Sequence, residues 1–122
     1  MVNVYDQIKD LQSYYSPKII AEVNNEYVKI AKIDGDKVPW HTHENEDELF
    51  LILEGFLVME IEHQPTFTMQ KGDLFVVPKG VNHKVSSKKE CTILLIESKT
   101  TLHTGNVITE ITKSINNQKN NV

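Results

Sequence analysis

The middle of the chain, residues 48–96, consists almost wholly of short apolar segments separated by turn-forming residues such as Gly55, Gly72 and Pro78. Six apolar segments occur there, at residues 49–53, 56–62, 66–69, 74–77, 81–85 and 92–96. A polar link at 86–90 separates the last two. Strands at this spacing, with no helical pattern between them, predict an all-β fold that is either a barrel or a sandwich.

The region before these segments predicts a short helix and then a β-hairpin. Asn3 is suited to cap a helix over about residues 3–12. Residues 18–23 and 26–33 have the composition of two strands, and Asn24-Asn25 between them tolerates the positive φ of a tight turn.

The length of 122 residues and the lack of an internal repeat indicate a single domain over 1–122. We expect its barrel core at about 17–100 and a polar C-terminal tail at about 114–122. From residue 116 the tail is mostly Asn, Gln and Lys, which predicts a frayed or disordered end.

Two histidines separated by one residue, His41 and His43, precede the first of the six segments. Alternate side chains of a strand point to the same face, so we expect both imidazoles on one side. Glu48 follows after a short acidic loop. Imidazole and carboxylate together suit a first-row transition metal, although an isolated pattern of this kind also fits a solvated loop.

The spacing around these residues resembles the two motifs of the cupin superfamily. The residues that fit the first motif are Gly35, His41, His43, Glu48 and Gly55. Those that fit the second are Gly72, Pro78, Gly80 and His83. The second motif usually closes with Asn four residues after its histidine, where this chain has Ser87.

The resemblance implies a double-stranded β-helix, the jelly-roll barrel of a small single-domain cupin, here with a short N-terminal helix. It also implies that His41, His43, Glu48 and His83 bind one divalent transition metal, for which Fe, Mn, Ni, Zn and Cu all stay open. Three neutral imidazoles and one carboxylate would leave the ion with a net charge of about +1. An ion that prefers six ligands would then have two open positions.

The alternation within 49–53 predicts what faces the metal. If Glu48 points inward, Phe50 and Ile52 share its side, whereas the equally apolar Leu49, Leu51 and Leu53 point outward. Residues 93–96 repeat the apolar run, which favours a second sheet or a second subunit as the cover. Together with the resemblance to other small cupins, this pattern predicts a homodimer.

Composition excludes several classes of partner. The formal net charge of −4 provides no basic surface for nucleic acid. No apolar run approaches the ~20 residues of a membrane span, and the N-terminus lacks the pattern of a signal peptide, so we expect a cytoplasmic location. All 13 basic residues are lysines, which disfavours the bidentate recognition of phosphate that arginine provides, although a general bias of Lys over Arg explains the composition equally well.

The remaining candidates have simpler explanations. We interpret His63 and His103 as surface histidines and the single Cys91 as a small core residue. The loop carboxylates Glu44, Glu46 and Asp47 could serve as a general base or orient an imidazole, but solvated side chains are the simpler interpretation. The aromatic residues that we assign to the core, with a pocket wall as the alternative, are Tyr27, Trp40, Phe50 and Phe75.

Two functions fit these features. The first is a small metal-dependent enzyme, a dioxygenase or an isomerase, that acts on a small organic molecule. The second is a module that binds a metal and a small ligand without turnover, because no convincing general acid or base occurs outside the ligand set. A motif that has lost its metal is disfavoured, since all four ligand residues are present.

Overall fold

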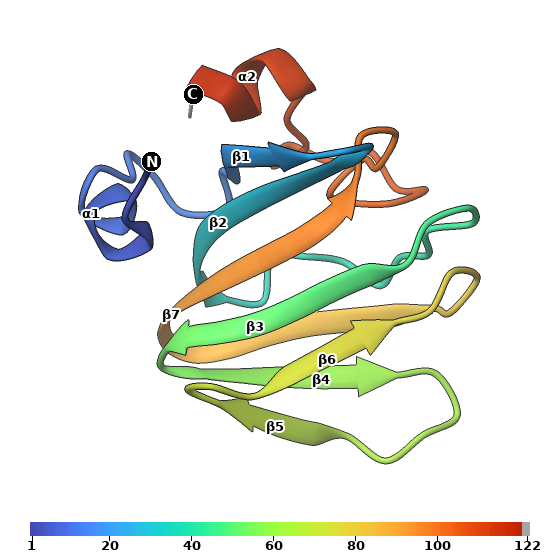
Figure 1. The fold of residues 1–122 in the computed structure, drawn as a ribbon. Coiled ribbons are helices and arrows are strands. Elements are labelled where there is room, and N and C mark those ends of the chain that lie inside the picture. The colour runs from blue at the N-terminus through green and yellow to red at the C-terminus, as the bar shows by residue number, and fades with distance from the viewer. Residues whose placement is uncertain (121–122) are drawn as a thin grey trace.

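The computed structural model describes residues 1–120 and contains seven strands and two short helices in that range (Figure 1). The helices are α1 (Val4–Lys9) and α2 (Ile115–Asn120). The strands are β1 (Lys18–Val23), β2 (Glu26–Gly35), β3 (Glu48–Glu54), β4 (Phe56–Ile61), β5 (Phe67–Gln70), β6 (Leu74–Val77) and β7 (His83–Ser98). All strand pairs are antiparallel, and the all-β jelly-roll barrel with its short N-terminal helix is confirmed.

The long strand β7 connects the two parts of the barrel. Its C-terminal half pairs with β2 and β3 in the order β1-β2-β7-β3-β6, while its first residues pair with β4, which in turn pairs with β5. The prediction of two strands with a link at 86–90 was therefore wrong. Ser86 pairs with Val58, and the Ser87 hydroxyl donates to the Ile33 carbonyl at 3.2 Å, so these polar residues continue the ladder.

The first hairpin and the alternation of β3 follow the prediction. β1 and β6 have the predicted bounds, and Asn24 has the positive φ, +53°, that the turn requires. Glu48, Phe50 and Ile52 are buried and Leu49 and Leu51 are half-buried. Leu53 was predicted to point outward but is buried.

The register between β3 and β7 shifts after Ile52, where the next paired residue of β3 is Glu54. A bulge of this kind ends the simple two-residue alternation, which explains why Leu53 is buried. The inward face of the barrel then forms one apolar core, to which Phe50, Ile52, Ile93 and Leu95 contribute.

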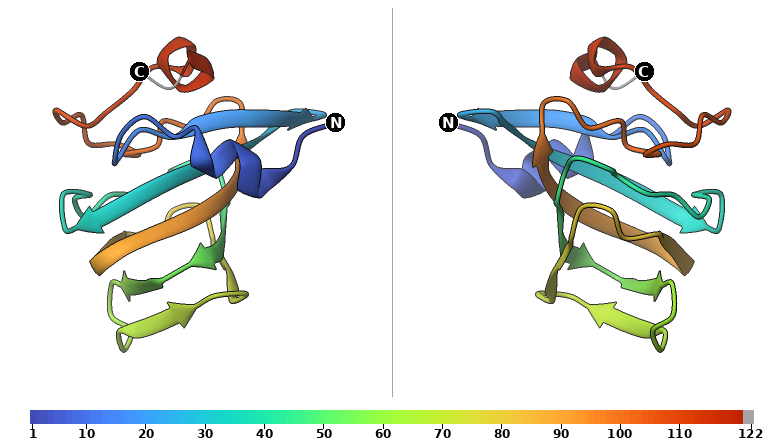
Figure 2. Two further views of the ribbon diagram at one scale, coloured as in Figure 1. Left: turned by 90° about the vertical axis from the view of Figure 1, so that its left-hand side faces the viewer. Right: turned by 90° about the vertical axis from the view of Figure 1, so that its right-hand side faces the viewer.

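Both chain ends differ from the prediction. The Asn3 side chain caps α1 by accepting from the Asp6 amide at 3.1 Å, but the helix ends at Lys9 and none of its residues is buried. The tail forms α2, which lies beside β1 (Figure 2), so the prediction of a disordered end was wrong as far as residue 120. Gln118 is buried there and donates from Nε2 to the Lys113 carbonyl at 2.9 Å. Residues 121–122 lie outside the described part of the chain.

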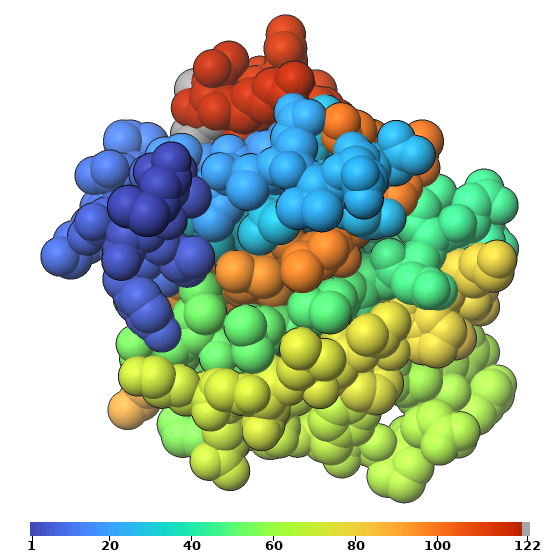
Figure 3. Space-filling model, in the orientation of Figure 1, coloured from blue at the N-terminus to red at the C-terminus, as the bar shows by residue number. Residues whose placement is uncertain are grey.

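The outer surface of the large sheet is apolar across four adjacent strands. Strand register places its members in two rows, namely Val28, Ile96, Leu49 and Val76, and then Leu94, Leu51 and Leu74. We call these seven residues the outer apolar face. Its strands β7, β3 and β6 form neighbouring orange, green and yellow bands in Figure 3. Leu74 and Val76 are 58% and 41% exposed, and the other five are half-buried.

Within residues 1–120, no helix has both the length and the apolar character needed to cross a membrane.

Candidate metal centre

The backbone brings the two histidine segments together. His41 and His83 pair through reciprocal N–H···O=C bonds of 2.9 Å, and the Gly80 amide donates to the His43 carbonyl at 2.8 Å. His41 and His43 therefore lie in an irregular segment with one bridge, not in the regular strand that the sequence predicted. The two side chains nevertheless point to the same interior position, because the bridge keeps the segment locally extended.

The four predicted ligand residues form one buried cluster. His41, His43, Glu48 and His83 offer donor atoms that all lie within 4.8 Å of one another. Glu48 Oε1 is 3.4 Å from His43 Nε2 and 3.5 Å from His83 Nε2. Two donors on opposite sides of an ion with ~2.1 Å bonds lie ~4.2 Å apart, so a slight contraction would fit this cluster to a metal ion.

The imidazole tautomers fit a metal. His41 Nδ1 lies 2.8 Å from the Pro39 carbonyl and His83 Nδ1 lies 3.0 Å from the Val81 carbonyl. A carbonyl only accepts, so each Nδ1 carries the proton and each Nε2 presents a lone pair. Both Nε2 atoms are buried without a hydrogen-bond partner, which is costly unless a ligand satisfies them.

The electrostatics of the cluster favour the charge states that metal ligands require. Burial, and then the neighbouring His83, lowers the pKa of His41 to about 4, so this imidazole is neutral at pH 7. Burial opposes the charge of Glu48, but its close contacts with His43, His83 and Glu97 hold its pKa well below the usual range. The cluster therefore combines neutral imidazole with an ionised carboxylate, as a cation needs.

A buried ion pair, which the sequence reasoning missed, lies next to Glu48. Lys29 Nζ is 3.1 Å from Glu97 Oε1, and both side chains are fully buried. Glu97 faces Glu48 across the β3–β7 ladder, and its pKa is raised well above the usual range by burial and then by the Glu48 charge. A protonated Glu97 can donate a hydrogen bond to Glu48, which would hold that carboxylate in place.

A signal for this pair was present in the sequence. Lys29 has the same strand parity as Ala31 and Ile33, and Glu97 has the same parity as Ile93 and Leu95. Charged residues at inward positions of otherwise apolar strands are rarely buried unless they are paired.

The segment after β7 packs against the segment that carries His41 and His43. Thr42 donates its amide to Asn106 Oδ1 at 3.0 Å, and the Asn106 amide donates to the Thr42 carbonyl at 3.1 Å. Gly105 packs so closely that a Cβ at this position would lie 2.5 Å from the Thr42 oxygen and 2.7 Å from His41 Cδ2. Only glycine allows this approach.

We therefore expect Gly105→Ala to weaken metal affinity by about tenfold or more, because the added methyl group displaces the His41 ring or the Thr42 backbone. Competition with a chromophoric chelator measures the affinity. Gly72→Ala is the matched control, since Gly72 also has positive φ but has nothing within 4 Å of the added Cβ. Equal affinities in the two variants would show that the contact does not support the site.

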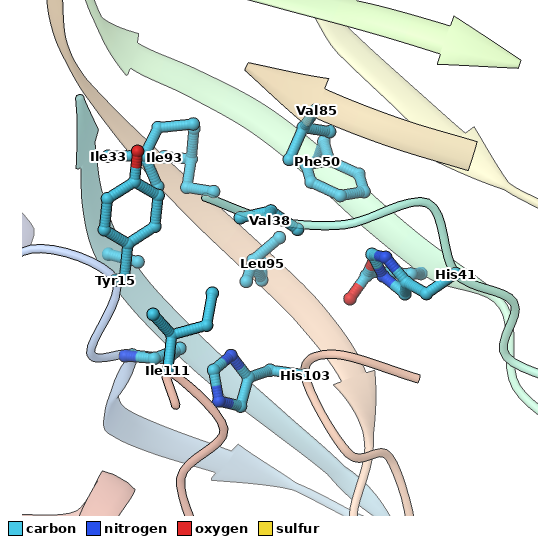
Figure 4. Close-up of a pocket in the computed structure, with 13 residues that line it drawn as sticks. Tyr15, Ile33, Val38, His41, Phe50, Val85, Ile93, Leu95, His103 and Ile111 are labelled. Atoms are coloured by element: carbon cyan, nitrogen blue, oxygen red, sulfur yellow. The ribbon is translucent and has the colours of Figure 1, made fainter. Parts of the chain in front are cut away.

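A cavity of about 40 Å³ lies beside the cluster, and His41 and Glu48 form part of its wall (Figure 4). Apolar side chains such as Phe50, Leu95 and Ile111 form most of the remainder. His103 also lines the cavity, so its interpretation as a surface residue was wrong. Burial, and then the nearby Lys29 charge, lowers the pKa of His103 to about 4.

The interpretation of His63 is confirmed, since its side chain is 87% exposed. Cys91 is fully buried, and burial raises the pKa of its thiol to about 12, so it is an unreactive core residue as predicted. Glu44 and Asp47 are exposed, as solvated loop carboxylates should be.

Among the aromatic residues, Tyr27 and Phe50 are buried and Phe75 packs against the core as a half-buried side chain. Trp40 is 41% exposed, so its assignment to the core was wrong. The backbone pairing of the adjacent His41 directs the His41 side chain inward, and the neighbouring Trp40 side chain lies at the surface.

An antiparallel jelly-roll barrel with an interior cluster of three histidines and a glutamate defines a class of small β-barrel proteins with a candidate metal site. The comparison with protein families identifies the class. The family described as "Cupin domain" matches residues 31–97, more than half of the chain, and this protein belongs to that family.

Individual proteins show the same likeness. The chain is 30% identical over 99 residues to "Uncharacterized protein YdbB" of Bacillus subtilis (strain 168), covering 81% of this chain and 84% of that protein. A cupin-2 domain containing protein from Shewanella frigidimarina NCIMB 400 is 37% identical with a TM-score of 0.77, over 81% of this chain and 95% of that one. Protein NMB1881 from Neisseria meningitidis is 28% identical with a TM-score of 0.73, over 81% and 99% of the two chains.

Proposed function

We propose that His41, His43, Glu48 and His83 bind one divalent transition metal and that the protein is a small metal-dependent enzyme acting on a small organic molecule. The observation that carries this proposal is that His41 and Glu48 belong both to the ligand cluster and to the wall of the apolar cavity. A molecule in the cavity would therefore lie next to the ion. A purely structural metal site is normally closed by its protein ligands.

The bound ion would supply a Lewis acid, or a site for dioxygen, beside the substrate. The protein's own residues exclude bulk water and fix the ligands. Pro39 and Val81 set the histidine tautomers through their carbonyls, and Glu97 holds the Glu48 carboxylate.

Of the two predicted reaction types, the cavity wall favours dioxygenase chemistry. An isomerase that moves a proton needs a general base. Among the described residues that line the cavity, the only ionisable groups besides His41 and Glu48 are His103 and Tyr15. His103 Nε2 already accepts from the Lys113 amide at 2.7 Å, and the Tyr15 hydroxyl already donates to the Asp34 carbonyl at 2.5 Å. The same scarcity of proton-transferring groups supports the alternative, a module that binds without turnover.

The experiment loads the protein separately with Fe, Mn, Ni, Cu and Zn and measures both binding and turnover of diphenols, β-diketones, keto acids and aldose–ketose pairs. Dioxygen uptake with one metal is the expected result. Tight binding of a compound without turnover under any metal would contradict the enzyme and support the binding module.

We also propose that the outer apolar face joins two copies of the chain into a homodimer. Seven apolar side chains in two continuous rows are more than a monomer usually leaves open to water. The face also lies on the edge strand β6, whose unpaired side a second copy can approach.

Sedimentation equilibrium at micromolar concentration is expected to give twice the 14.0 kDa of one chain. Leu74→Lys together with Val76→Lys should give the single-chain mass, because both side chains are exposed within the face and charges there oppose its burial. Ile108→Lys is the control, since Ile108 is 72% exposed and lies outside the face. A single-chain mass for the unmodified protein at every concentration would rule out the dimer.

A further inference from the structure

The cavity also has a polar group in its wall, His103, which belongs to the segment that follows β7. His103 Nε2 lies 2.7 Å from the backbone amide of Lys113, which can only donate. Nε2 is therefore the accepting nitrogen, and the proton of the neutral ring is on Nδ1. The hydrogen bond with Lys113 thus fixes both the tautomer and the orientation of the ring.

The protonated nitrogen faces the cavity. Figure 4 shows the His103 ring among the cavity-lining side chains, with one nitrogen directed toward the cavity and the other away from it. The nitrogen that bonds Lys113 is engaged with the C-terminal segment, so the Nδ1–H group is the one directed inward. Within residues 1–120 it has no hydrogen-bond partner. The His103 side chain is half-buried, and an N–H group that lines an otherwise apolar cavity favours a ligand that carries an acceptor.

The lack of a free cation among the described residues of the cavity wall disfavours a negatively charged ligand as the acceptor. Among residues 1–120, no lysine lines the cavity, and Lys29, the cation with the largest effect on His103, is already paired with Glu97. With a pKa of about 4, His103 stays neutral at physiological pH. A phosphorylated ligand would have to bury its negative charge against apolar side chains such as Ile33, Leu95 and Ile111, which is strongly unfavourable.

The volume restricts the ligand further. The cavity is partly open, and about 40 Å³ is a few times the ~10–15 Å³ that one water molecule needs, so its walls enclose only a few heavy atoms of a ligand.

We propose that the ligand is a small uncharged carbonyl compound with an apolar body and a second oxygen, which presents one oxygen to the metal at the His41–Glu48 wall and accepts a hydrogen bond from His103 Nδ1–H with the other. This inference rests on the proposed function, because it uses the metal for one end of the ligand. His103 then determines specificity, because its hydrogen bond raises the affinity for compounds that carry a second oxygen.

The test measures binding to the metal-loaded protein by calorimetry or NMR titration, independently of turnover. The probes are short hydroxyketones (3-hydroxy-2-butanone, 4-hydroxy-2-butanone and 5-hydroxy-2-pentanone), each compared with the ketone that lacks the hydroxyl group. Dihydroxyacetone phosphate is the charged comparison. We expect at least one hydroxyketone to bind more tightly than its parent ketone, and the phosphate ester to bind more weakly than that hydroxyketone.

His103→Gln is the informative variant, because a glutamine oxygen can replace Nε2 as the acceptor for Lys113 but leaves no donor at the position of Nδ1. It should weaken hydroxyketone binding about tenfold and leave binding of the parent ketone, metal affinity and melting temperature unchanged. His103→Asn, whose amide can replace the Nδ1 donor, should recover part of the affinity. His63→Gln, at an exposed histidine, is the control.

The inference is wrong if no hydroxyketone binds better than its parent ketone, if the phosphate ester binds best, or if His103→Gln binds the hydroxyketone as the unmodified protein does. The proposed metal site is tested separately, since metal affinity is measured on the same samples without any ligand. A protein that binds metal and fails the ligand test keeps the proposed site and loses only this inference.

Discussion

Replacing Lys29 with methionine is expected to lower the free energy of unfolding by about 3–5 kcal/mol, as removal of one partner from a buried ion pair typically does. Methionine fills a similar volume, so the loss reflects the buried negative charge of the adjoining Glu48–Glu97 pair, which Lys29 no longer offsets, and not a cavity. Urea denaturation of the metal-free protein, followed by far-ultraviolet circular dichroism, measures the change.

Two further variants isolate the cause. Lys29→Met combined with Glu97→Gln should recover part of the loss, because the amide needs no cationic partner and can still donate to Glu48. Lys99→Met removes the cation of a surface pair, 2.9 Å from Glu22, and should cost less than about 1 kcal/mol. If Lys29→Met costs no more than Lys99→Met, the buried pair is not a major determinant of stability.

Replacing Glu48 with glutamine is expected to lower turnover by orders of magnitude, with each tenfold loss corresponding to ~1.4 kcal/mol of transition-state stabilisation. Glutamine keeps the size of the side chain but removes the only negative charge that we assign to the ion, which changes its Lewis acidity. It also changes the group that lies 3.4 Å from His43 Nε2 and 3.5 Å from His83 Nε2.

Steady-state kinetics on a substrate found in the metal-loaded screen measures this effect, with metal content determined in parallel. Glu44→Gln is the matched control, because Glu44 is an exposed carboxylate four residues away, on the loop that precedes β3. Turnover in Glu48→Gln close to that of Glu44→Gln, at equal metal content, would mean that the charge of Glu48 has no part in the chemistry.

The sequence predicted best those features that depend on neighbouring residues. The turn at Asn24 and the inward parity of Glu48 and Phe50 follow from local backbone preferences and from the two-residue period of a strand. Motif spacing predicted that His41 and His83 belong to one site, and the structure shows the backbone pairing that brings the two residues together.

The features that the sequence did not predict depend on contacts between distant segments. His103 lines the cavity because the segment after β7 returns across the barrel, where Lys113 holds its ring. Gly105 packs on His41 for the same reason. The inward positions of Lys29 and Glu97 could have been inferred from strand parity, but their pairing needs the β2–β7 register.

The most direct test of the proposed site is the metal content of the protein purified without chelators, measured by elemental analysis together with His41→Ala and His83→Ala. One equivalent of a divalent transition metal per chain is expected in the unmodified protein, and loss of stoichiometric metal is expected in both variants. Each variant removes one buried Nε2 donor from the cluster. Full retention of one equivalent in both variants would contradict the proposed ligand set.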